Sequence, residues 1–195
     1  QGSDSVELIG LLSFADNNLE YGYDEDWAFP NICTGEPCEG WEYNSVDNYI
    51  RDRKNATVDI KLVSAESGRI LNNSSGWVAG IYWRDQDEQL LRQYTYASGD
   101  FTSDFETSNQ AIYGQLDTQL SDALTLTSGL RFEKRSADYR DSEAVAHNVD
   151  ENLWGGRIAL NYQYSDQTMV YGLVSRGFKA GGVNSNPALS AEDRE

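Results

Sequence analysis

The chain has 195 residues, of which 39% are apolar and 12% aromatic, and its formal net charge is −17. This acidic balance argues against a nucleic-acid-binding surface, because contacts with phosphates require clustered Lys and Arg side chains. The low apolar content fits poorly with a packed globule and the abundance of aromatic residues fits poorly with disorder, whereas a β-barrel wall accommodates both.

Segments in which apolar and polar residues alternate recur along the whole chain, and no apolar run is long enough for a membrane-spanning helix. The clearest example is Leu124–Tyr139, whose period of two is that of a strand. Asp16-Asn17-Asn18 is a turn signal, because Asn and Asp tolerate left-handed backbone angles. We therefore predict eight strands: Val6–Asp16, Leu19–Trp27, Tyr49–Ser64, Gly76–Gln89, Thr107–Leu120, Leu124–Tyr139, Asn152–Tyr164 and Thr168–Val183.

The predicted connections differ in length between the two ends of the sheet. Short turns are expected at Asp16–Asn18, Ser121–Ala123 and Ser165–Gln167, on the same side as a longer turn at Ala65–Ser75. Long polar loops are expected on the other side, at Asp26–Asn48, Tyr94–Glu106 and Asp141–Glu151. This sorting, together with strands longer than the roughly 9–11 residues that cross a bilayer, is typical of an outer-membrane barrel.

The first long loop contains both cysteines of the chain, Cys33 and Cys38. Their closeness among Pro and Gly residues predicts a local disulfide in an oxidising compartment. Half of a metal site is the alternative, but no further Cys or His lies nearby, so we expect no metal. Trp27, Trp41 and Tyr43 of this region are candidates for stacking on a ligand, or else for an interfacial aromatic girdle or a small loop core.

Arg131, Arg157 and Arg176 lie opposite the apolar stripes of their predicted strands, so we expect their side chains in the lumen of a barrel. They would form an electrostatic path for an anionic ligand, or else pair with carboxylates of neighbouring strands or of a plug inside the barrel. In the last strand we expect Met169, Tyr171 and Leu173 to face lipid. Because the sequence contains no G-x-S-x-G, H-E-x-x-H, Walker-loop or Rossmann motif, we expect neither enzyme activity nor a cofactor.

Three segments share the features of one known family. Ser175–Asn184 reads SRGFKAGGVN, Ala111–Glu133 reads AIYGQLDTQLSDALTLTSGLRFE, and the hairpin around Asp166 continues into TMVY. In wording, order and spacing these segments resemble TonB-dependent outer-membrane receptors. Val183 departs from the pattern, since an aromatic residue is common there.

The resemblance implies a 22-stranded barrel with an N-terminal plug. Such receptors bind siderophores, cobalamin, haem or glycans, and the TonB complex powers uptake through the plug. Neither the plug nor the C-terminal strands are recognisable, so we expect residues 1–195 to be a fragment: an all-β, antiparallel, up-and-down transmembrane barrel segment of about eight strands. The outer membrane, its lipid, the TonB complex and a small-molecule or glycan ligand are the implied location and partners. The alternatives are a soluble β-rich carbohydrate-binding module and a passive porin-like barrel.

Overall fold

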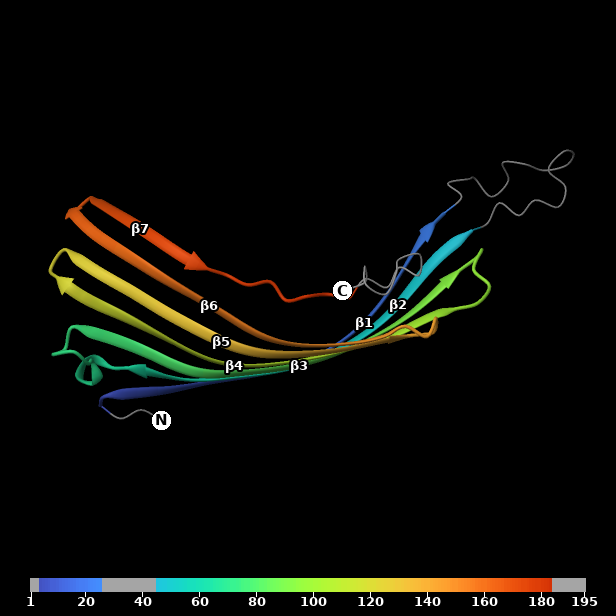
Figure 1. The fold of residues 1–195 in the computed structure, drawn as a ribbon, viewed down its shortest axis with the longest axis horizontal. Helices are drawn as coiled ribbons and strands as arrows, with labels where there is room; N and C mark the ends of the chain where they lie inside the picture. The colour runs from blue at the N-terminus through green and yellow to red at the C-terminus, as the bar shows by residue number, and fades with distance from the viewer. Residues whose placement is uncertain (1–3, 26–44, 184–195) are drawn as a thin grey trace, which may run out of the picture.

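The computed structural model describes residues 4–25 and 45–183. They form one antiparallel sheet whose seven strands are adjacent in sequence order. Figure 1 shows a single curved layer with the short turns gathered at one end. Within the described residues no helix is long and apolar enough to cross a membrane. The strands are β1 Val6–Asp24, β2 Val46–Ser64, β3 Ser75–Tyr94, β4 Phe101–Ser121, β5 Leu124–Asp141, β6 Ala146–Ser165 and β7 Thr168–Arg176, with one 3₁₀ turn at Glu66–Gly68.

The predicted hairpin at Asp16–Asn18 is wrong, because β1 runs through it without interruption. Asp16, Asn17 and Asn18 pair in continuous register with β2. The Asn18 side-chain amide donates a hydrogen bond to the Asp52 carboxylate at 2.5 Å, across the strand pair. These polar residues therefore serve cross-strand contacts instead of a turn, and the described part of the chain has seven strands where eight were predicted.

The strands are also longer than predicted at the end opposite the short turns. The predicted loop Tyr94–Glu106 shrinks to 95–100, and the predicted loop Asp141–Glu151 shrinks to 142–145. Polar pairs continue the ladder there; for example, the Ser136 hydroxyl donates to the Asp150 carboxylate at 2.5 Å. The turn at 65–74 is longer than both of these connections, so the predicted sorting of loop lengths does not hold for them.

The turn at 65–74 has a defined structure of its own. Leu71, Asn72 and Asn73 have φ angles of 52°, 57° and 64°, a left-handed run that suits Asn better than Leu. The Trp77 indole Nε1 donates to the Gly68 carbonyl at 3.0 Å and holds the turn against the start of β3. The tight turns predicted between β4 and β5 and between β6 and β7 are confirmed.

Strand register separates the side chains into two faces. One register row joins Ile60, Ile81, Ile112, Phe132 and Trp154 across β2 to β6. We call the face that carries this row the apolar face and the opposite one the polar face. Ile112 is 61% exposed, and the buried apolar residues among those described are only Ala111, Ala137 and Tyr139. A single layer with so little internal core must have its apolar face covered by another apolar medium.

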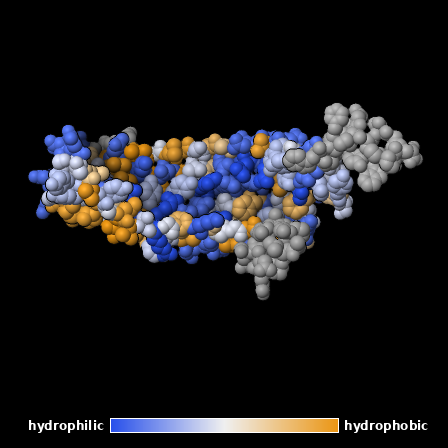
Figure 2. All heavy atoms as spheres, turned by 90° about the horizontal axis from the view of Figure 1, so that it is seen from above, coloured by the Kyte–Doolittle hydropathy of each residue, from blue (hydrophilic) through white to orange (hydrophobic). Residues whose placement is uncertain are grey.

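The apolar face is mainly apolar in the half of each strand nearest the short turns. There the apolar run ends at Phe14, Trp83, Ile112, Phe132 and Trp154, and two positions further along the same face come Asp16, Asp85, Gln110, Lys134 and Asn152. The pair Ile50 and Leu91 is an isolated apolar exception beyond this limit. We call the apolar half of this face the belt. We call the other half of the strands, with both of its faces, the strand extension. Figure 2 shows hydrophobic residues gathered at the turn end and hydrophilic ones over the middle.

Strand length explains this division. Strands β1 to β6 have 18 to 21 residues. Crossing a bilayer takes about 9–11 tilted residues, so roughly half of each strand is left over. Because the ladder satisfies every backbone group, the extension stays in strand form even where both faces are polar.

Candidate ligand-facing surface

Level with the belt, the polar face carries a set of tyrosines around one arginine. The Tyr113 hydroxyl donates to the Asp59 carboxylate at 2.6 Å. The Arg131 guanidinium lies 4.8 Å from the centre of the Tyr82 ring and 5.9 Å from that of Tyr113. Its ion pair with Glu133, at 2.7 Å, neutralises the charge. Arg131 therefore takes the structural role that the sequence left open, since its partners fix it between two rings.

Arg157 lies on the same face with different partners. Its guanidinium donates to the Gln115 side-chain oxygen, and the Gln115 amide donates to Asp117 at 2.8 Å. Asp117 also accepts a hydrogen bond from the Thr127 hydroxyl at 2.6 Å. Among the described residues no carboxylate lies within ion-pair distance of Arg157. A neutral amide thus orients this cation without cancelling its charge.

Glycines open a hollow of about 510 Å³ beside these arginines, lined by Tyr113, Arg131, Arg157 and Phe178 among others. A Cβ built on Gly155 would lie 3.2 Å from Cδ1 of the Phe178 ring, so the ring rests on the bare backbone of β6. The hollow combines a charge-bearing guanidinium with aromatic walls, which suits an anionic ligand that also has flat apolar parts.

The segment 177–183 was predicted to continue the last strand, but β7 ends at Arg176. The Gly181 N–H donates to both carboxylate oxygens of Glu151, at 3.1 and 3.2 Å. Glu151 also accepts from Arg135 at 2.8 Å. Because this backbone donor pairs with a side chain and Phe178 packs on Gly155, the segment leaves the ladder and lies against the polar face of β6.

Arg176 does not lie where it was predicted. Register pairs Gly156 with Arg176 and Ile158 with Val174, which places Arg176 on the apolar face. Its guanidinium carbon lies 3.6 Å from the centre of the Trp154 ring.

Met169, Tyr171 and Leu173 correspondingly lie on the polar face, paired with Gln163, Asn161 and Ala159. The predicted facing of β7 is therefore wrong. This strand has apolar residues on both of its faces, so its sequence pattern does not show which face meets lipid.

The strand extension carries a second cluster on the polar face. The rings of Tyr21 and Tyr49 stack with their centres 5.1 Å apart. Arg92 lies 5.3 Å from the Tyr49 ring centre and binds both oxygens of Asp47, at 2.7 and 2.6 Å. The hydrogen bond from Arg92 holds the pKa of Asp47 below its ordinary value, and burial raises the pKa of Tyr49. Arg51 and Arg53 share Glu88 in the same region.

Sequence reasoning missed this extension cluster. Its signal was present, because Asp47, Tyr49, Arg51 and Arg53 recur at every second position. The first of these residues was assigned to the long loop, and the row was not separated from the remaining polar positions. The candidates Trp27, Trp41 and Tyr43, and the cysteines Cys33 and Cys38, lie outside the described residues. Within 4–25 and 45–183, no group of three His, Cys, Asp or Glu residues is arranged to hold a metal ion.

A one-layer antiparallel sheet with an apolar belt on one face and ordered polar rows on the other forms part of the wall of a membrane-spanning β-barrel. The chain belongs to the family of TonB dependent receptor-like β-barrels, whose family model matches residues 4–192. Members of this family are barrels of the outer membrane, which locates the chain there.

Solved receptors share the fold. The ferric yersiniabactin uptake receptor FyuA from Yersinia pestis has a TM-score of 0.73 at 17% identity, covering 97% of this chain and 28% of the receptor. The siderophore receptor PiuA from Acinetobacter baumannii has a TM-score of 0.61 at 11% identity, covering 88% and 30%. BauA, the ferric preacinetobactin receptor of that species, has a TM-score of 0.53 at 18% identity, covering 96% and 31%. The chain thus spans under a third of each receptor. No curated protein matches it significantly.

Proposed function

We propose that this chain is part of the wall of a receptor that takes up an extracellular nutrient with energy supplied by TonB, and that the nutrient is an anionic ferric chelate of the siderophore class. The three solved receptors described above are receptors for ferric yersiniabactin, for a siderophore and for ferric preacinetobactin. The observation that carries the proposal is Arg157, which has no carboxylate partner among the described residues. Register places it on the face opposite the belt, and it also lines the hollow of about 510 Å³.

With the belt in lipid, the polar face lines the interior of the barrel. An anionic ligand gains most from a cation that nothing else neutralises, so Arg157 attracts it more strongly than Arg131, which Glu133 already pairs. The stacked tyrosines and Arg92 of the strand extension lie near the end of β1 and the start of β2, on the route that a ligand takes from outside.

The remaining parts of the proposal concern residues beyond this surface. Trp27, Trp41 and Tyr43 would make the first contacts with the ligand, on a loop closed by a Cys33–Cys38 disulfide. Residues 1–195 would supply part of the barrel, and the rest of the receptor would supply the further strands and the plug that TonB engages. We propose siderophores as the ligand class, and cobalamin, haem and glycans are the alternative classes. The process is binding and passage, with no covalent step.

The soluble carbohydrate-binding module is disfavoured. It requires two sheets packed face to face, whereas the strands of the described part form one sheet with large exposed apolar residues on one side. A passive porin-like barrel makes the same belt, so only energy dependence separates it from the proposed receptor.

Transport measurements on the full-length receptor test the proposal. The receptor is produced in a Gram-negative strain that lacks its other siderophore receptors, and uptake of radioactive iron is measured with a panel of purified ferric siderophores. Uptake is expected only when TonB is present. Uptake that persists without TonB would identify a passive pore, and binding of a glycan with no iron uptake would show that the ligand class is wrong.

Two variants test the role of Arg157. Arg157→Gln is expected to weaken binding of the transported chelate by roughly 10- to 100-fold, since a charge-assisted hydrogen bond contributes about 1.5–3 kcal/mol. Arg157→Lys keeps the charge and is expected to retain most of the affinity. Arg140→Gln is the matched control, because Arg140 lies on the opposite face, in the strand extension. Equal affinities for Arg157→Gln and the control would remove Arg157 from the ligand path.

A further inference from the structure

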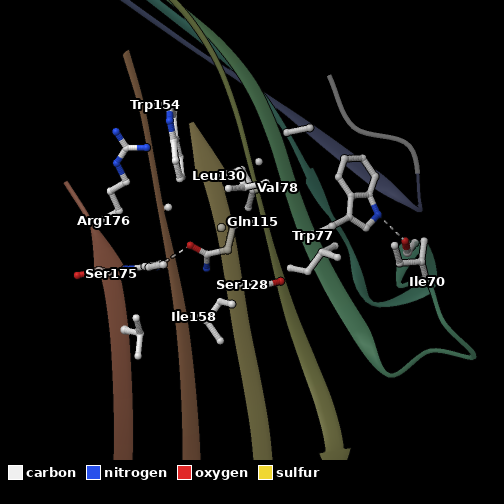
Figure 3. Close-up of a pocket in the computed structure, with 18 of the residues that line it drawn as sticks. Ile70, Trp77, Val78, Gln115, Ser128, Leu130, Trp154, Ile158, Ser175 and Arg176 are labelled. Carbon is white, nitrogen blue, oxygen red and sulfur yellow. Dashed lines mark hydrogen bonds between the residues drawn. The ribbon is translucent and has the colours of Figure 1, made fainter. Parts of the chain in front are cut away.

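The apolar face carries a groove that is built mainly from belt side chains, although Gln115 and Arg157 also contribute to its lining. Its volume is about 920 Å³, and nearly all of its lining is apolar. Figure 3 shows Trp154 and Arg176 at one end and Trp77 and Ile70 at the other, with Leu130 and Ile158 between them. The groove therefore runs across the strands, from β3 to β7.

Two neighbouring register rows define the groove. The first row is Trp77, Leu116, Ser128, Ile158 and Val174, and the second is Ala79, Gly114, Leu130, Gly156 and Arg176. Four inter-strand spacings give a length of about 19 Å. Both rows contain residues with small side chains or none. Leu130 leans into the space over Gly156, where a Cβ would lie 2.8 Å from Leu130 Cδ2.

The groove rises through the depth of the belt. Trp77 is two residues from the turn-side end of β3, which begins at Ser75, whereas Arg176 is eight residues from the turn-side end of β7, which begins at Thr168. Trp154, beside Arg176, is the last apolar residue on this face of β6 before Asn152. One end of the groove thus lies near the short turns, and the other at the upper edge of the belt.

A cation marks the upper end. The Arg176 guanidinium stacks on Trp154 at 3.6 Å, and among the described residues it has neither a carboxylate partner nor a hydrogen-bond acceptor. Stacking on the ring face fixes the guanidinium plane and leaves its N–H groups free to donate. An anion at the membrane interface would complete this arrangement, in a chain whose own charge is strongly negative.

We propose that the groove binds a phosphorylated glycolipid of the outer leaflet, with an acyl chain along the two register rows and a phosphate on Arg176. The connection from β1 to β2, residues 25–45, is longer than the turn at 65–74, so we assign its end of the sheet to the outside, and Arg176 then lies at the level of the outer-leaflet headgroups. An acyl chain lying across the strands fills a hollow that straight lipid tails, packed along the membrane normal, fill poorly. Arginine binds phosphate through two parallel N–H donors, which gives this site its specificity for phosphate.

Lipid retention by the full-length receptor tests the proposal. The receptor is placed in nanodiscs that contain lipid A or phosphatidylglycerol, exchanged into detergent, and analysed by native mass spectrometry. The wild type is expected to retain one lipid A per barrel. Arg176→Gln is expected to weaken retention at least tenfold and Arg176→Lys to weaken it less, because a charged hydrogen bond contributes about 1.5–3 kcal/mol. Ser128→Phe, which fills the groove, is expected to abolish retention.

Two comparisons make the test decisive. Dephosphorylated lipid A is expected to bind the wild type as weakly as phosphorylated lipid A binds Arg176→Gln, and Arg140→Gln is expected to behave as the wild type. Heat-modifiable migration on gels verifies that every variant is folded. Equal retention by the wild type and Arg176→Gln would overturn the phosphate contact. Equal retention of phosphatidylglycerol would overturn the choice of a glycolipid, and retention by Ser128→Phe would place the lipid elsewhere.

Discussion

Replacing Ile158 by Arg tests whether the apolar face meets lipid. Ile158 is 60% exposed and lies on this face of β6, four residues from Trp154 and four from Tyr162. Two aromatic residues at equal distances on either side place it near the middle of the belt. An Arg on the lipid face costs about 2–4 kcal/mol at the bilayer midplane and about 0–1 kcal/mol near the interface. Ile158→Arg is therefore expected to lower the folding equilibrium constant roughly 30- to 700-fold.

The matched control is Asn152→Arg, on the same strand and face but beyond Trp154 in the strand extension. Here we expect a cost of at most about 1 kcal/mol, because the side chain stays in water or at the interface. Equilibrium unfolding of the full-length receptor in lipid vesicles, followed by tryptophan fluorescence, measures both costs as shifts of the denaturant midpoint at unchanged slope. Equal costs for the two variants would refute the assignment of the belt.

Three further predictions concern other parts of the chain. The pKa of Asp47 is below its ordinary value of 3.8 because Arg92 donates to it, so its contribution to stability is complete above that value and is lost as the pH falls below it. Hydrogen exchange at the loop ends of β2 and β3 is expected to accelerate below about pH 4 in the wild type. The variant Asp47→Asn is expected to exchange fast at every pH. A wild type whose exchange does not accelerate at low pH would contradict the stabilising role of the Asp47–Arg92 pair. Gly80→Ala is expected to destabilise by about 1–3 kcal/mol, because its Cβ would lie 2.4 Å from the Tyr113 ring. Gly10→Ala, where the Cβ has nothing within 4 Å, is expected to be neutral or stabilising by up to about 1 kcal/mol in the same vesicle assay; similar effects at both sites would show that the ring moves aside freely. Finally, peptide mass mapping without reduction is expected to find Cys33 and Cys38 linked, and quantitative alkylation of both thiols would contradict this.

The sequence was sufficient to predict the class of fold, because alternation in the belt has a strong cause. Leu124, Leu126, Leu130 and Phe132 face a medium without water, so apolar residues are favoured at every second position, with Ser128 as the one polar exception among them. The strand extension has no such constraint. Residues such as Asp150 and Asn148 satisfy hydrogen bonds equally well in a loop or in a ladder, so their polarity predicted loops where the structure has strands.

The candidate site was predictable only in part. Arg131 and Arg157 sit opposite clear apolar stripes, and the polar face follows from that alternation. Their different roles depend on Glu133 and Gln115, of which Gln115 lies on another strand and is brought close by register alone. The face on which Arg176 lies is set by its pairing with Gly156. This pairing cannot be read from the sequence of β7, because β7 has apolar residues on both faces.

The two-part strands also have a consequence for the order of assembly. A slip by one residue would turn the belt side chains of a strand from lipid to water, so register is strongly selected there. In the extension most positions on both faces are polar, with exceptions such as the pair Ile50 and Leu91, so the same slip would cost less. The correct pairing of Tyr21 with Tyr49, or of Asp47 with Arg92, is therefore inherited from contacts made lower on the same strands. We expect the barrel wall to close from the membrane upward, so that the surface nearest the ligand is the last to form and takes its geometry from the lipid-facing half.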